Sequence, residues 1–68
     1  MNTETVNPVD LMVGDTIVLS NGQKTVGKET VKSGYFGTLV DGERLKTVER
    51  VLFPKWFKGE VTGYHSQI

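Results

Sequence analysis

The sequence predicts one small, all-β domain, and three observations lead to this fold class. The chain has 68 residues, enough for one domain with a thin core. Two dipeptides typical of tight β-turns, Asn21-Gly22 and Asp41-Gly42, lie about twenty residues apart, each after a β-rich run. This spacing favours an antiparallel meander over a strand-helix-strand unit. With so few residues, four to five strands would best bury their edges by bending into a nearly closed barrel.

The first elements follow from local signals. Asn7 and Pro8 suit the start of a short helical turn, because Asn caps a helix and Pro fits its first position. A strand over 16–19 follows, with Ile17 and Leu19 on one face. Asn21-Gly22 predicts a type I′ turn, with positive φ at both residues. The returning strand is expected over 23–26 and, after a bulge at position 27, on to 31.

The next signals predict a second hairpin. Ser33-Gly34 indicates a turn, and residues 35–40 have the aromatic and β-branched content of a strand. Gly37 inside that run indicates a bulge, a sharp bend or the close approach of another backbone. Asp41-Gly42 then marks the next hairpin turn.

The remaining third of the chain is less regular. Residues 43–53 suit either a strand or a helix, and we favour a strand with a helical turn near 48–50. Pro54 is expected to end that element. Residues 55–59 form a short aromatic and basic turn, residues 60–64 a last strand, and the ends 1–6 and 65–68 are expected to be flexible.

A core this thin is expected to rest on the few large side chains of the chain. We therefore predict a core in which aliphatic residues surround the aromatic ones: Tyr35, Phe36, Phe53, Trp56, Phe57 and Tyr64. The adjacent aromatics of residues 53–57 cannot all face inward. One or two should enter the core, and Trp56 or Phe57 should remain at the surface.

Composition argues against an enzyme and against a metal or other cofactor. Eight basic residues balance eight acidic ones, and cysteine is absent. The one imidazole, His65, is expected in a flexible tail, and no phosphate-binding glycine loop or metal-ligand spacing is present. Of the close carboxylates, Asp10 and Asp15, the second is expected to cap the turn before the first strand. No apolar run could span a membrane and no leader is recognisable, so we expect a cytoplasmic protein.

One resemblance adds to this interpretation. The hairpin that opens many SH3-like barrels, including the KOW-type modules of transcription and translation proteins, resembles Leu11-x-x-Gly14-Asp15-x-Ile17-x-Leu19 followed by Asn21-Gly22-x-Lys24-x-x-Gly27-x-x-x-Val31. It implies a small barrel that binds nucleic acid, ribosomal components or RNA polymerase. The chain has Lys24-Thr25 where KOW modules prefer Lys-Gly. In size and charge balance it also resembles bacteriophage accessory proteins.

The strongest candidate for recognition is the segment Phe53-Pro54-Lys55-Trp56-Phe57-Lys58. An exposed aromatic beside cations suits a protein pocket, with Tyr35 and Tyr64 extending the face. The predicted protein-binding residues are Tyr35, Lys55, Trp56, Phe57, Lys58 and Tyr64. We predict a non-catalytic module that docks on a larger protein as adaptor or inhibitor, in transcription, translation or phage–host interplay.

Nucleic acid is the alternative partner, because bases stack on exposed rings while cations meet phosphate. A basic stripe across the sheet would supply those cations: Lys24, Lys28, Lys32, Arg44, Lys46 and Arg50. The zero net charge argues against this alternative. An exposed sheet edge also leaves self-association open.

Overall fold

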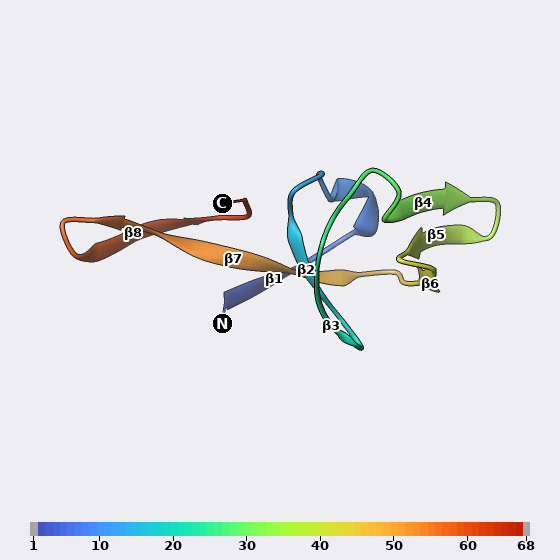
Figure 1. Cartoon of the computed structure of the whole chain (residues 1–68), viewed down its shortest axis with the longest axis horizontal. Coiled ribbons are helices and arrows are strands. Elements are labelled where there is room, and N and C mark those ends of the chain that lie inside the picture. The colour runs from blue at the N-terminus through green and yellow to red at the C-terminus, as the bar shows by residue number, and fades with distance from the viewer. Residues whose placement is uncertain (1, 68) are drawn as a thin grey trace.

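The all-β class is confirmed by the computed structural model, which describes residues 2–67. This part of the chain forms eight strands and one short 3-10 turn. The elements are β1 (Asn2–Val6), η1 (Pro8–Asp10), β2 (Thr16–Leu19), β3 (Gly22–Thr25), β4 (Val31–Gly34), β5 (Gly37–Val40), β6 (Glu43–Arg44), β7 (Val48–Phe57) and β8 (Glu60–His65). The strands belong to a five-stranded and a three-stranded antiparallel sheet (Figure 1).

Strand β7 organises the larger sheet. Its first half lies between β1 and β2, with Val48 opposite Val6 and Arg50 opposite Ile17. Its second half pairs with β8. The strand predicted within 43–53 is thus present, but the helical turn expected at 48–50 is wrong, because β1 and β2 flank those residues. The stop expected at Pro54 is wrong too, since β7 continues to Phe57.

Pro54 fits inside β7 because that part of the strand forms one side of a two-stranded ribbon. A proline cannot donate a backbone hydrogen bond, and it is tolerated where one edge of a strand has no neighbour. Among the described residues, Pro54 is paired with Tyr64 of β8 alone.

The predicted hairpins are present, with different turns. β2 and β3 form the expected hairpin, but Gly22 has positive φ (120°) and Asn21 does not. The positive φ at both central residues that defines type I′ occurs instead at Asp41-Gly42 (51° and 84°) and at Lys58-Gly59 (51° and 80°). In the hairpin expected at Ser33-Gly34, the tip is Tyr35-Phe36, and β5 starts only at Gly37.

The chain leaves the first sheet after β3, so the strand predicted to continue to residue 31 is wrong. The Gly27 N–H donates to the Thr30 hydroxyl oxygen (2.8 Å), and this turn starts the second sheet, ordered β4-β5-β6. Within residues 2–67 the strand pairs form two open sheets, and no closed barrel is found. The molecule is elongated, with principal extents of 48 × 20 × 16 Å.

The core lies between the two sheets and is aliphatic. Ile17 of β2 and Val40 of β5 have no exposed surface. The core cluster comprises Ile17, Leu19, Val26, Val40 and Val48, with Val6, Leu11 and Leu45 packed against it. The predicted aromatic core is therefore wrong. A thin space between two small sheets is filled by branched aliphatic side chains, and the aromatic ones lie on elements that extend beyond it.

The first and last described residues have structural partners, whereas residues 1 and 68, also expected to be flexible, lie outside the described part. Residues 2–6 form β1 along β7, although flexibility was expected for them. Near the other end, Gln67 donates from its side-chain amide to the Val13 carbonyl (3.1 Å) and to Asp15 (3.0 Å). Asn7 caps η1 as predicted, accepting a hydrogen bond from the Val9 N–H (3.2 Å).

Candidate functional site

The predicted recognition segment lies on a hairpin that projects from the body of the molecule. Residues Phe53–Phe57 of β7 and Glu60–His65 of β8 form this hairpin, which we call the arm, and it occupies one end of the molecule (Figure 1). Lys58-Gly59 forms its turn. The basic turn predicted at 55–59 is thus mostly strand, and only its last two residues form the turn.

Strand pairing assigns the side chains of the arm to two faces, because directly opposed residues point to the same side. Pro54 lies opposite Tyr64, and Trp56 lies opposite Val61. Pro54 and Trp56 are two residues apart on one strand, so these four side chains share one face, which we call the apolar face.

A β-bulge makes this arrangement possible. Lys55 lies opposite Gly63, whereas the next residue, Trp56, lies opposite Val61, so Thr62 is an extra residue in β8. Its hydroxyl donates to the Lys55 carbonyl (3.4 Å). Val61 and Tyr64 are three residues apart and would point to opposite sides of a regular strand. The bulge places both on the apolar face.

The apolar side chains of the arm are largely exposed to solvent. The exposed fraction is 66% for Trp56, 63% for Phe57, 49% for Tyr64 and 42% for Val61. The expectation that one or two aromatics of residues 53–57 enter the core is wrong, because none of them belongs to the core cluster, although Phe53 is half-buried. Both Trp56 and Phe57 are at the surface.

The cations of the arm lie beside these aromatics. Lys55 shares the second face of the arm with Phe57 and Glu60. Lys58 places its Nζ 5.4 Å from the centre of the Phe57 ring, in the range of a cation–π contact. Within residues 2–67 neither lysine forms an ion pair. Of the predicted binding residues, Lys55, Trp56, Phe57, Lys58 and Tyr64 are therefore brought together on the arm.

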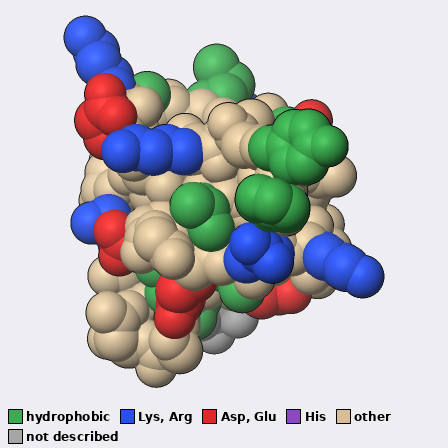
Figure 2. Space-filling model, turned by 90° about the vertical axis from the view of Figure 1, so that its right-hand side faces the viewer, with side chains coloured by type: hydrophobic (Ala, Val, Ile, Leu, Met, Phe, Trp, Pro, Cys, Tyr) green, Lys and Arg blue, Asp and Glu red, His purple; other side chains and the backbone are tan. Residues whose placement is uncertain are grey.

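Tyr35 is not brought to that site. With Phe36 it forms the tip of the β4–β5 hairpin, at the opposite end of the molecule from the arm turn (Figure 1). The two rings meet edge to face with centroids 5.1 Å apart, and they are 96% and 76% exposed. Figure 2 shows this end, with hydrophobic side chains in the middle of the view and Lys, Arg and acidic side chains around them.

The six cations proposed for nucleic acid do not form one stripe. They are spread over β3, β4, β6, β7 and two connections. Lys24 is paired with Asp41 (3.3 Å) and Lys32 with Glu29 (3.6 Å). Arg50 is paired with Glu4 and with Asp15 (3.3 Å). Half of the proposed phosphate contacts are thus engaged with carboxylates, while Lys28, Arg44 and Lys46 are exposed without an ion pair among the described residues.

The pair formed by Arg50 and Asp15 supports the fold. Asp15 is fully buried and accepts hydrogen bonds from the Met12 N–H (2.9 Å), Gln67 (3.0 Å) and Arg50 (3.3 Å). Burial raises the pKa of the Asp15 carboxyl, but these hydrogen bonds outweigh burial and hold that pKa below its usual range. The hydrogen bond to Glu4 raises the pKa of the Arg50 guanidinium, against the opposing effect of burial. As predicted, Asp15 caps the turn before β2.

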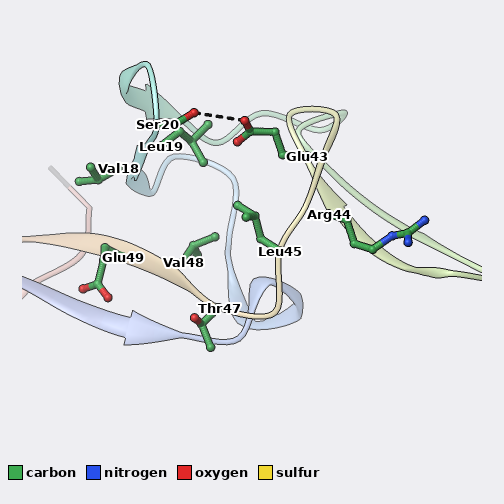
Figure 3. A pocket seen from close by; sticks show the side chains of 9 residues that line it. All are labelled: Val18, Leu19, Ser20, Glu43, Arg44, Leu45, Thr47, Val48 and Glu49. Carbon is green, nitrogen blue, oxygen red and sulfur yellow. Dashed lines mark hydrogen bonds between the residues drawn. The ribbon is translucent and has the colours of Figure 1, made fainter.

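A shallow hollow lies where the two sheets meet (Figure 3). It holds about 420 Å³ between the β2–β3 turn and the connection from β6 to β7. Ser20 donates a hydrogen bond to Glu43 (3.1 Å) across its rim, while Leu45 and Val48 line it. Among residues 2–67, no three His, Cys, Asp or Glu side chains gather as a metal site requires.

The hairpin of the arm could have been predicted in part from the sequence. Lys58-Gly59 is a two-residue turn with glycine in second place, flanked by residues with β propensity, and the sequence interpretation gave it no hairpin. Val61 was missed as a site residue for the same reason. The bulge at Thr62 has no sequence signal, because it depends on how β8 pairs with β7.

Comparison with known proteins gives no relative. No family model matches the chain, and neither a curated protein nor a solved structure does so. Among the residues that the structure describes, no helix is long and apolar enough to cross a membrane.

Proposed function

We propose that this protein is a non-catalytic module of the cytoplasm that docks on a larger protein through its arm, as an adaptor or inhibitor. The observation that carries the proposal is the apolar face, where Trp56, Val61 and Tyr64 lie side by side and exposed. Trp and Tyr are frequent anchors of protein interfaces, because each buries a large area at a low cost in side-chain entropy.

The arm's own stability supports the same proposal. A two-stranded ribbon without a covering layer is marginally stable in water. A partner that covers Trp56 and Tyr64 would remove their exposed apolar surface from water and stabilise the ribbon. Lys55 and Lys58 at its margin would favour an acidic rim on that partner.

The alternative, nucleic-acid binding, has less support, because Lys24, Lys32 and Arg50 are already paired with carboxylates. The experiment described below also measures nucleic-acid binding. The resemblance of the first hairpin to KOW-type modules adds transcription and translation complexes to the partners to be sought.

The test compares three forms of the tagged full chain: wild type, Trp56→Ala on the arm and Tyr35→Ala at the opposite end. Each captures proteins from nuclease-treated lysate of the organism that encodes the chain. We expect one defined protein to bind wild type and Tyr35→Ala, and to bind Trp56→Ala at least tenfold more weakly, as for a hot-spot residue.

In parallel, fluorescence anisotropy measures the binding of single- and double-stranded oligonucleotides at low and high salt. Salt-sensitive oligonucleotide binding without a protein partner would overturn the proposal. The proposal would also be overturned if Trp56→Ala captured the partner protein as well as wild type does while circular dichroism showed that the variant is folded.

A further inference from the structure

We propose that two copies of this chain associate through the outer edge of β8, which joins their arms into one four-stranded antiparallel sheet. The inference concerns the free edge of the arm and does not depend on the proposed docking function. It rests on the length of that edge and on the self-complementary pattern that the bulge creates.

β8 is the longest of the strands that have a single neighbour in the described sheets. It has six residues and is paired with β7 alone, whereas β1, β3, β4 and β6 have two to five. The free edge of β7 along the arm contains Pro54, which cannot donate a backbone hydrogen bond to a second strand. Free strand edges present unpaired N–H and C=O groups to any second strand. Glu60 is the only Asp, Glu, Lys or Arg residue of β8. Charged side chains therefore do little to prevent this edge from pairing with a second strand.

A two-fold axis perpendicular to the sheet sets a strict condition on the register. Such an axis maps each face of the sheet onto itself, so the two residues of every opposed pair must lie on the same face of one chain. In a regular strand this requires paired positions an even number of residues apart.

The bulge at Thr62 changes this condition for β8. Val61 and Tyr64 lie on the apolar face, and Glu60 and His65 lie on the other face, opposite Phe57 and Phe53. The register that pairs all six residues, Glu60 with His65 and Val61 with Tyr64 of the second copy, is therefore compatible with both faces. In a regular strand the same register would place the two residues of each pair on opposite faces of the sheet.

The pairs in this register are chemically complementary. Val61 opposite Tyr64 is a β-branched residue beside an aromatic one, a favourable cross-strand combination. Glu60 lies opposite an imidazole, so no two carboxylates meet. Thr62 lies opposite Gly63, where a Cβ would find no atom within 4 Å, so the centre of the interface has room.

The resulting sheet would have the strand order β7-β8-β8-β7. Pro54, Trp56, Val61 and Tyr64 of both copies would lie on one side of it. The apolar face would double in extent while keeping its tryptophans exposed, and the arm would no longer be a lone two-stranded ribbon.

Sedimentation equilibrium over a range of concentrations up to millimolar tests the proposal with the full chain. Wild type should form dimers and no larger species. Charge substitutions on the face away from Trp56 test the register. His65→Glu places two carboxylates opposite each other at both ends of the interface and should weaken the dimer by about tenfold.

The double variant Glu60→Lys/His65→Glu places a lysine opposite a glutamate at both ends of the interface and should regain the dimer. Lys28→Glu, far from the arm, should dimerise as wild type does. Circular dichroism of each variant checks the fold.

A chain that stays monomeric at millimolar concentration would overturn the proposal. A dimer that His65→Glu does not weaken, or that the double variant does not restore, would overturn the register and with it the inference. Because these substitutions leave the apolar face intact, partner capture by a monomeric variant would show that docking survives the failure of dimerisation.

Discussion

The body of this molecule, meaning everything except the arm, and the arm itself are both built from antiparallel strands, but they differ in how far their apolar side chains are exposed to solvent. In the body, Ile17 and Val40 have no exposed surface. In the arm, Trp56 and Phe57 are about two-thirds exposed. The larger side chains are thus the exposed ones.

The difference lies in what covers each strand. The three-stranded sheet packs over one side of the body, and the core fills the space between the sheets. The arm has no second layer among the described residues. Burial here is decided by the layer above a strand, and side-chain hydrophobicity alone does not predict it.

The largest expected effect tests this contrast directly. Ile17→Ala should lower the free energy of unfolding by about 3 kcal/mol, because it leaves a cavity in the core. Trp56→Ala, although it removes more atoms, should change it by less than about 0.5 kcal/mol, because those atoms are mostly in water. Urea unfolding followed by circular dichroism measures both. A loss for Trp56→Ala equal to that for Ile17→Ala would mean that the arm packs against the body.

An intermediate loss of unfolding free energy is expected for a substitution of Asp15, whose carboxylate accepts hydrogen bonds from Met12 in the loop before β2 and from Gln67 near the C-terminus. Asp15→Asn should cost about 2 kcal/mol at neutral pH, because the charged hydrogen bond from Arg50 is lost. The folded-state pKa of Asp15 is lowered from 3.8. Its stabilising contribution is therefore full above that value and is lost as the pH falls through the lower folded pKa.

The measurement for Asp15 is the unfolding free energy of both forms from pH 7 to pH 2. The gap between wild type and Asp15→Asn should narrow as the pH falls below about 4. A gap that is constant over this range would show that the Asp15 carboxylate is not the stabilised species.

A loss of stability smaller than that for Asp15→Asn separates the arm from the body. Gly59→Ala should destabilise the arm by about 1 kcal/mol, because Gly59 has a φ of 80° that alanine adopts at a cost. Gly63→Ala is the matched control, since a Cβ has open space at both sites and Gly63 lies outside the positive-φ region.

Native-state hydrogen exchange shows where the Gly59→Ala effect is located. Amide protection in β8 should fall roughly fivefold, while protection in β2 stays unchanged. An equal loss of protection in β2 would mean that arm and body open as one unit.

Local signals in the sequence were sufficient for much of the fold. Asn21-Gly22 and Asp41-Gly42 marked two real hairpins, and Asn7 with Pro8 marked the start of η1. These signals work because turn and cap geometry depends on adjacent residues. The I′ conformation expected at Asn21-Gly22 is found at Lys58-Gly59, where the sequence interpretation placed no hairpin.

For the candidate site, the sequence indicated which aromatic side chains are exposed better than it indicated which of them lie together. Residues 53–58 hold more aromatics than a small core can take; Trp56 and Phe57 are exposed, and Phe53 is half-buried. Their grouping with Tyr35 failed, because Tyr35 lies on a hairpin at the other end of the molecule. Sequence proximity gave no information on that distance.

The amino-acid sequence by itself determined the β class, the places where the chain turns and the presence of excess aromatic surface. These follow from backbone preferences and from composition, which need no distant contact. Tertiary structure alone decided three other features: that the N-terminal residues pair with β7 as β1, that aliphatic residues form the core, and that Val61 joins Trp56 on one face of the arm. Each depends on pairing between residues that are not neighbours in sequence, such as Val6 with Val48 or Trp56 with Val61 across a bulge, and no local preference specifies that pairing.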